Sequence, residues 1–237
     1  NSVAPIEAAG APTETPTAEP EKSDKLIEVL YHPDPSASYN QRRGRWSGIY
    51  AIEFTPILPK QFQSPIDNRP FLDSFSGRKT TLSEVTVGTK CNLVIGGLTA
   101  ELSYGQALIR EDDNNKITRS LYLERQAVSL GYAMDKLLTE PYFAPYVRFQ
   151  MYGFNYEETY GNEKRKGTIS PSSATTIGIL MQLNWIEKKL AYESLVNHDL
   201  NNTFLDIFAT KQNPSGKSDE PNMETGFDVG AGIKLEF

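Results

Sequence analysis

The residues of this sequence that could do chemistry are charged side chains that recur at every second position of apolar segments. Carboxylates can bind cations or exchange protons, and a guanidinium group can bridge two carboxylates at once. Opposite the apolar residues lie six acids and four bases: Glu53, Glu84, Glu101, Asp206, Asp228, Glu236, Lys90, Arg125, Arg148 and Lys234. If these segments close around a common interior, the charged side chains that share it must pair with one another. We therefore predict an ion-pair network with Arg125 and Arg148 as its hubs.

Residues suited to catalysis or metal binding are scarce. His198 is followed by Asp199 and stands one helical turn after Ser194, which is the one arrangement typical of a nucleophile and its base. A solvated loop histidine is the simpler interpretation. Only His32 and Cys91 could add a soft ligand, and no phosphate-binding glycine motif occurs. We expect no catalytic residue, no metal ion and no cofactor.

The composition narrows the class of protein. The chain has 237 residues, with 24 basic and 30 acidic side chains and a formal net charge of −6. This acidic balance argues against nucleic-acid binding, which draws its affinity from a basic face. No window approaches the roughly 18 uninterrupted apolar residues of a membrane helix. A membrane β-barrel stays possible, because only every second residue of its strands must be apolar.

The chain divides near residue 45. Residues 1–45 form a Pro-rich tail, with 6 of the 15 prolines within the first 40 residues, and such a stretch predicts an extended linker. It begins without a recognisable export signal, and the remaining features favour a signal that has been removed. One apolar island could add as a strand or dock in a groove, so it is a candidate oligomerisation arm: Leu26, Ile27, Val29, Leu30 and Tyr31.

From residue 46 to 237 the dominant pattern is alternation with a period of two, which is typical of strands. In residues 227–237 every odd position is apolar and every even position is charged or glycine. Similar alternation predicts about eight strands, many of them long enough to cross a bilayer with the roughly 9–11 tilted residues needed. The outward, lipid-facing set includes Val147, Phe149, Ile177, Ile179, Met181, Leu183, Ile233 and Leu235.

The connections between the expected strands alternate in length. Long polar ones are predicted at 59–78, 112–115, 162–167 and 213–219, and shorter ones at 96–97 and 135–141. The connection 187–202 is the exception, because its apolar spacing indicates a helical turn. Aromatic residues fall at strand ends, where membrane interfaces would lie: Trp46, Tyr122, Tyr132, Tyr142, Phe143 and Trp185. A soluble β-sandwich is the alternative, since it also alternates polar and apolar residues.

The alternating last strand and its aromatic terminus, Phe237, resemble the terminal signal of bacterial outer-membrane β-barrel proteins. The resemblance covers residues 46–237 and is one of architecture. It implies an all-β fold, a closed up-and-down antiparallel transmembrane barrel of about eight strands, in a Gram-negative outer membrane. An interior of that size is just wide enough for side chains to fill it. We therefore expect a structural or porin-like role without catalysis, the alternatives being a narrow ion or small-solute channel and a lipid-modifying barrel enzyme.

The expected partners are outer-membrane lipids or lipopolysaccharide and further copies of the chain. Two polar residues, Glu124 and Gln126, fall on the outward face and would fit a contact with another protomer. The cluster Arg42, Arg43 and Arg45 fits either such a contact or anionic lipid headgroups. A homo-oligomeric scaffold of this kind would be similar to the ring-forming, lipid-enclosing barrels of predatory bacteria.

Overall fold

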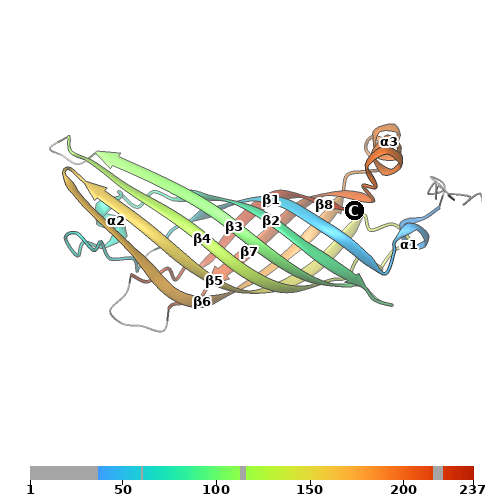
Figure 1. Cartoon of the computed structure of the whole chain (residues 1–237), viewed down its shortest axis with the longest axis horizontal. Coiled ribbons are helices and arrows are strands. Elements are labelled where there is room, and N and C mark those ends of the chain that lie inside the picture. The colour runs from blue at the N-terminus through green and yellow to red at the C-terminus, as the bar shows by residue number, and fades with distance from the viewer. Residues whose placement is uncertain (1–36, 60, 113–115, 216–220) are drawn as a thin grey trace, which may run out of the picture. The chain divides into compact units, whose positions relative to one another are not determined.

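Eight antiparallel strands close into a barrel in the computed structural model, which describes residues 37–59, 61–112, 116–215 and 221–237. Each strand pairs with the next, and β1 closes the ring by pairing with β8 (Figure 1). The strands are β1 Trp46–Ile57, β2 Thr80–Asn92, β3 Gly97–Asp112, β4 Thr118–Ala133, β5 Phe143–Tyr160, β6 Glu163–Gln182, β7 Asn202–Gln212 and β8 Phe227–Glu236. The predicted up-and-down barrel of eight strands is confirmed. The candidate arm at residues 26–31 lies outside the described residues.

Burial along the strands is inverted relative to a soluble protein. In β8, Phe227, Val229 and Ile233 are exposed on the outer face, whereas Lys234 and Glu236 are buried inside. A similar alternation of exposed outward and buried inward positions runs along the other strands, except in the first part of β6, where residues 163–168 are exposed or half-exposed. A closed ladder leaves no unpaired strand edge, and an apolar outer surface matches acyl chains. The barrel is therefore built for a lipid bilayer, and the sandwich alternative is wrong.

The residues that the sequence assigns to the lipid face lie on outward positions of β5, β6 and β8, with one exception. Phe149, Ile177, Ile179 and Ile233 are exposed, and Val147, Met181 and Leu235 are half-exposed. Leu183 comes one residue after β6 ends, although its backbone N–H still donates to the carbonyl of Thr203. Trp185 lies in the connection beyond it. The strand therefore ends at Gln182, before the apolar alternation of the sequence ends.

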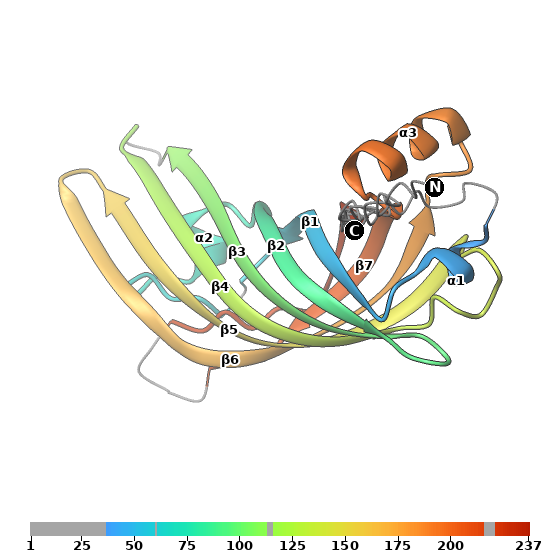
Figure 2. The same ribbon diagram turned by 45° about the vertical axis from the view of Figure 1, so that its right-hand side comes forward.

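Strands β3 to β6 are longer than the others and project past them at one end (Figure 2). The predicted loop at 162–167 is wrong, because β5 and β6 continue through it and turn at Gly161 and Asn162. Gly161 has a φ of +59°, a conformation that glycine adopts without strain. The pairing of β5 with β6 shifts between Tyr152 and Phe154, beside Pro171. Proline cannot donate to the ladder, which explains an irregularity there.

The two rims of the barrel carry different connections. We call the end with residues 37–45, 93–96, 134–142 and 183–201 the inner rim, and the end with residues 58–59, 61–79, 116–117, 161–162, 213–215 and 221–226 the outer rim. The inner rim holds α1 Tyr39–Arg42 and α3 Lys188–His198, while α2 Phe71–Ser74 belongs to the outer rim (Figure 1). The expected asymmetry of loop lengths is only partly right, since just two of the outer connections are long. No helix among the described residues is long and apolar enough to cross a membrane.

Candidate functional site: the filled interior of the barrel

The inner end of the interior is filled by a residue that comes from outside the strands. Tyr39 of α1 enters the barrel, where its hydroxyl accepts a hydrogen bond from Lys90 Nζ at 2.7 Å and contacts Asp135 Oδ2 at 2.9 Å. Lys90 Nζ also lies 2.7 Å from Glu236 Oε1 and 2.5 Å from Asp135 Oδ2. Arg43 fastens the same layer by binding Asp135 at 3.1 Å and the carbonyl oxygens of Leu93 and Gly96 at 3.0 Å.

The ionisation of this inner layer follows from burial and from the neighbouring charges. Burial by itself raises the pKa of Asp135, but Lys90, Arg43 and the Tyr39 hydrogen bond outweigh it and hold the pKa below its usual value. Burial raises the pKa of Tyr39 well above its usual value, and Glu236 and Asp135 raise it further. The layer therefore contains a neutral phenol, Tyr39, and two carboxylates, Asp135 and Glu236, that pair with the basic side chains of Lys90 and Arg43.

The central layer is organised around Arg148. Its two terminal nitrogens each bind one oxygen of Glu53 at 2.8 Å, and Nη1 also contacts Glu101 at 3.3 Å. Lys234 Nζ binds the other oxygen of Glu101 at 3.0 Å, so two cations face two carboxylates. The side chains of this layer are at most 7% exposed. A bidentate guanidinium–carboxylate pair is among the strongest polar contacts available in so dry a site.

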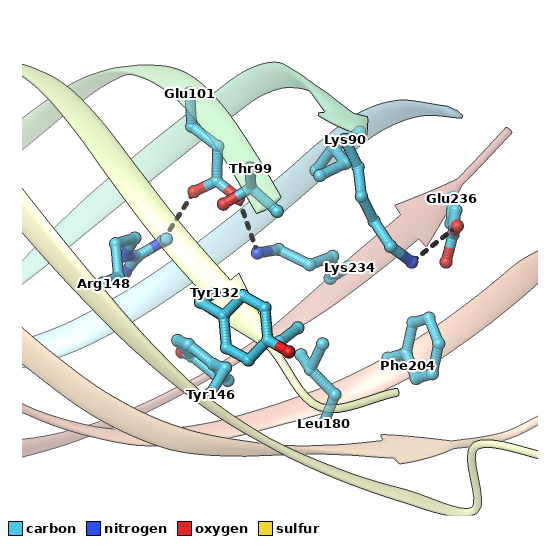
Figure 3. A pocket seen from close by; sticks show the side chains of 13 residues that line it. Lys90, Thr99, Glu101, Tyr132, Tyr146, Arg148, Leu180, Phe204, Lys234 and Glu236 are labelled. Atoms are coloured by element: carbon cyan, nitrogen blue, oxygen red, sulfur yellow. Dashed lines mark hydrogen bonds and ion pairs between the residues drawn. The ribbon is translucent and has the colours of Figure 1, made fainter. Parts of the chain in front are cut away.

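A small enclosed cavity of ≈ 20 Å³ separates the central layer from the inner layer (Figure 3). Glu101, Arg148 and Lys234 line one part of it, and Lys90 and Glu236 line another. A water molecule needs about 10–15 Å³ of such space. The cavity therefore has room for one or two waters.

A third ionic layer lies further along the interior. Arg125 pairs with Glu84 through Nη1 and donates to Gln150 Oε1 at 2.9 Å through Nη2. Its guanidinium also stands 5.0 Å from the ring centre of Tyr152, within the range of a cation–π contact. Arg125 is 1% exposed and is the largest fully buried side chain of the described residues.

Inward-facing glycines make room for these long side chains. Gly105 lies directly across the ladder from both Glu84 and Arg125, and Gly232 lies across from Glu53. A Cβ added at Gly105 would overlap the side chain of Glu84. Small residues beside large ones allow a narrow barrel to hold a layer of charged groups. The same arrangement places Gly131 opposite Arg148.

The outer part of the interior has a different filling. A loop segment from connection 58–79 folds inward, and its Phe62, Phe71 and Phe75 are fully buried. They pack with strand residues of one apolar cluster: Ile57, Leu82, Ala107, Ile109, Leu121, Leu123, Ala127, Tyr152, Phe154, Ile169 and Ala174, together with Met223 of connection 213–226. Phe71 and Phe75 pack with their ring centres 5.0 Å apart and their ring planes tilted by 35°. We call this loop segment, residues 61–76, the plug.

A polar clamp holds the plug at the outer rim. Arg119 of β4 binds Glu158 of β5 at 2.8 Å and Asp67 of the plug at 2.7 Å. It also donates to the hydroxyls of Ser64 and Ser74 at 3.0 Å. Burial raises the pKa of Asp67, but the hydrogen bonds from Arg119 and neighbouring groups lower it more, so it lies below its usual value. The clamp therefore joins an ionised carboxylate of the plug to the strands.

The structure separates the ten predicted interior charges into groups instead of one network. Glu53, Glu101, Arg148 and Lys234 come together in the central layer. Lys90 and Glu236 form the inner layer, and Arg125 pairs with Glu84. Asp206 accepts a hydrogen bond from Tyr146 at 2.9 Å, and Asp228 lies 3.9 Å from Lys79 at the outer rim.

Several interior residues fall outside the predicted set, and two of them carry no signal in the sequence that would place them inside. Tyr39 and Arg43 stand in the Pro-rich tail, and both contact Asp135. Arg119 and Glu158 lie on inward positions near the outer ends of β4 and β5. Extending the alternation of these two strands toward the outer rim would have predicted both residues.

His198, Ser194 and Asp199 lie at the C-terminal end of α3. His198 is the last residue of α3 and is exposed, and Asp199 follows in a left-handed conformation. Among the described residues, no hydrogen bond joins the side chain of His198 to Ser194 or Asp199. The described residues also hold no group of three or more potential metal ligands.

The closed ring of strands and the apolar exterior decide the kind of fold. This is the fold of a small outer-membrane β-barrel. A barrel of eight strands with an apolar outer band belongs in a bacterial outer membrane. No protein-family model matches the chain, and no curated protein matches it in sequence.

Three solved structures share the barrel fold at low sequence identity. Neisserial surface protein A is 11% identical over 81% of this chain and 96% of that chain, with a TM-score of 0.46. The N-terminal β-barrel domain of OprF from Pseudomonas aeruginosa is 12% identical over 81% and 98%, with a TM-score of 0.42. Ail, the attachment invasion locus protein of Yersinia pestis, is 8% identical over 82% and 97%, with a TM-score of 0.42.

Proposed function

We propose that this protein is a closed, non-conducting barrel that serves as a homo-oligomeric structural element of the outer membrane. The observation that carries the first part is the sequence of fillings along the interior. From the inner rim outward, the Tyr39 layer, the Arg148 layer, the Arg125 pair and the plug follow one another along the interior, which supports a closed barrel. An eight-stranded barrel leaves little space beyond its side chains. Its work is then done by the outer surface and the rims.

Conductance in planar bilayers tests the closed interior. The full-length protein is expected to give no steady channel currents. Deleting the plug (residues 61–76 replaced by a short Gly-Ser linker) is expected to stay silent, because the ionic layers still block the interior. Adding Tyr39→Ala, Arg125→Ala and Arg148→Ala to that deletion removes a large side chain from each ionic layer and should allow small currents. Reproducible channels from the wild-type protein would favour the narrow-channel alternative and overturn this part of the proposal.

The homo-oligomer rests on a polar patch on the outer face of β3 to β6. Tyr104 and Gln106 of β3, Glu124 and Gln126 of β4, and Asn155 of β5 are neighbours across the ladders. Gln106 Nε2 donates to Tyr104 Oη at 2.9 Å, and Tyr122 Oη donates to Glu124 Oε1 at 3.3 Å on the same face. A groove of ≈ 520 Å³ lies beside the patch, between Gln126 and Pro171.

The depth of this patch explains why a partner is needed. Tyr132 marks the inner interface on the outer face of β4, and Gln126 lies six positions further along the same strand. At a rise of roughly 3.3 Å per residue and a tilt near 45°, Gln126 stands about 14 Å above Tyr132. The apolar band of such barrels is about 25 Å tall. Polar groups at that depth are costly against lipid, and a second protomer would cover them.

The mass of the protein in native-like lipid tests the oligomer. Full-length protein extracted with its lipids is expected to be a multimer, and Glu124→Leu/Gln126→Leu is expected to release monomers that remain folded. The matched control Thr81→Leu/Thr203→Leu adds two leucines to outward positions of β2 and β7 and should leave the multimer intact. A wild-type monomer, or a double variant that stays multimeric, would contradict the proposed interface.

A further inference from the structure

A cavity of ≈ 290 Å³ opens at the inner rim, between the segment that carries α1 and the helix α3. Both helices lie at the same end of the barrel in the two views (Figures 1 and 2). Its volume is near the lower end of the range for small-molecule sites, about 300–1,000 Å³. The cavity is separate from the barrel interior and plays no part in closing it.

The charged groups of this cavity differ from those of the interior. Arg42 and Lys188 both line it, and among the described residues neither forms an ion pair. Arg42 uses its Nε to donate to the carbonyl of Ala37 at 2.9 Å, which leaves its terminal nitrogens available. In contrast, Arg43, Lys90, Arg125, Arg148 and Lys234 are all paired with carboxylates.

One carboxylate also lines the cavity. Glu140 accepts the backbone N–H of Tyr39 at 2.8 Å through Oε1, and its Oε2 has only a long contact of 3.4 Å from Gln182. It is half-buried. The cavity therefore offers two positive groups and one negative group to the same occupant.

The surroundings place the cavity at the depth of lipid headgroups. Tyr142, Trp185 and Tyr192 line it and are exposed, with Trp185 at 56%. The neighbouring Ile186 and Leu190 of the α3 region are exposed as well. Tyrosine and tryptophan concentrate at membrane interfaces, and a helix with exposed apolar residues and lysines can lie in the interfacial plane.

We infer that this cavity binds the headgroup of a phospholipid that carries both a phosphate and a primary ammonium, of the phosphatidylethanolamine type. Arg42 and Lys188 bind the phosphate, Glu140 accepts hydrogen bonds from the ammonium, and the acyl chains pass along Trp185 and Ile186 into the bilayer. The inference rests on the outer-membrane location and is independent of the closed interior and of the oligomer.

The three charges distinguish this lipid from two close relatives. Phosphatidylglycerol offers a phosphate to the cations but leaves Glu140 facing a hydroxyl-bearing, uncharged group. Phosphatidylcholine offers a phosphate and a quaternary ammonium, which has no N–H to donate. Hydrogen bonds that involve charged groups contribute about 1.5–3 kcal/mol each, so the loss of one is measurable as a preference.

Native mass spectrometry of the full-length protein tests this lipid preference. Protein is transferred from mixed vesicles that contain equal amounts of phosphatidylethanolamine, phosphatidylglycerol and phosphatidylcholine, and the lipids that remain bound are counted. We expect phosphatidylethanolamine to be retained roughly tenfold over phosphatidylcholine, as expected for one charged hydrogen bond. Equal retention of the three lipids, or a preference for phosphatidylglycerol, would overturn the inference.

Matched variants locate the site. Arg42→Gln/Lys188→Gln should lower retention of phosphatidylethanolamine and phosphatidylglycerol alike, while Glu140→Gln keeps the acceptor for Tyr39 and should remove only the preference for phosphatidylethanolamine. The control Arg45→Gln/Lys136→Gln removes the same charge from the inner rim outside the cavity and should leave retention unchanged. An equal loss in this control would show attraction to the whole basic rim and contradict a defined site. Heat-modified gel migration confirms that each variant is folded.

Discussion

The inner and outer parts of the barrel interior are filled by opposite chemistry. In the inner part, strand residues such as Glu53, Glu101 and Arg148 form paired ionic layers. In the outer part, Phe71 and Phe75 of the plug pack against apolar strand residues. The ionic filling is supplied mainly by the strands, whose alternation fixes which side chains point inward. The apolar filling requires a loop to fold back, and no local pattern specifies that.

Substitutions in the ionic layers and in the apolar plug are expected to affect stability in different ways. A buried ion pair adds little net stability over apolar groups, yet removing one partner is strongly destabilising because the other charge stays buried. An apolar plug loses stability in proportion to the surface and volume removed, and a loop can relax around the change. The ionic layers should therefore be intolerant of single substitutions, and the plug more tolerant.

The largest effect is expected for Arg148→Ala. This change leaves Glu53 without its bidentate partner and Glu101 with Lys234 alone. Breaking a buried pair costs about 3–5 kcal/mol. The free energy of unfolding, measured by urea titration in lipid vesicles, should fall by about that amount. Arg110→Ala, an exposed arginine of β3, is the control and should change it by less than about 0.5 kcal/mol. Equal losses for the two variants would mean that the central layer is not dry.

A smaller effect is expected for Phe71→Ala in the plug. Phe71 is fully buried between Phe62 and Phe75. Truncation of a buried phenylalanine costs about 3–5 kcal/mol, and we expect about 3 because the loop can relax. Leu72→Ala changes the adjacent, exposed residue of α2 and should cost little. If Leu72→Ala destabilised the barrel as much as Phe71→Ala, the plug would not be packed as described.

These two regions show what the sequence can predict. The strands and the inward set could be predicted because a period of two is local and survives over ten or more residues, as in Phe227–Glu236. The assignment of the charges to separate layers could not, because it depends on which residues face each other across the ladder, such as Glu53 and Gly232. Tyr39 and Phe71 were missed for another reason. Each enters the barrel from a non-repeating segment, and only tertiary packing decides where such a segment goes.

Substitution of an inward glycine tests how tightly the ionic layers are packed. Gly105→Ala is expected to destabilise the barrel by about 1–3 kcal/mol, because its new Cβ would overlap Glu84 in the Arg125 layer. Gly153→Ala is a matched control on β5, where a Cβ would meet no atom within 4 Å. Urea titration of both variants in the same vesicles compares them. A neutral Gly105→Ala would show that the third ionic layer has space to rearrange.

The smallest effect is expected from pH, and it compares the carboxylates at the two rims. Both Asp135 of the inner layer and Asp67 of the clamp have pKa values below their usual value in the folded protein. A lowered pKa gives stability that is present above the unfolded value, near pH 4, and is lost as the pH falls through the folded value. Tyr39 acts in the opposite direction, because its raised pKa gives stability that is lost only above about pH 10.

The acid loss should be larger for Asp135 than for Asp67. The side chain of Asp135 is 1% exposed and that of Asp67 is 25% exposed, so solvent screens the Arg119–Asp67 pair more. Unfolding free energies measured between pH 2.5 and 6 are expected to fall less steeply in Asp135→Asn than in the wild type, and Asp67→Asn should differ from the wild type by less. If Asp135→Asn left the fall of the unfolding free energy at low pH unchanged, the pH dependence would come from the strand carboxylates. The inner rim would then be held by hydrogen bonds and packing around Tyr39 instead of by charge.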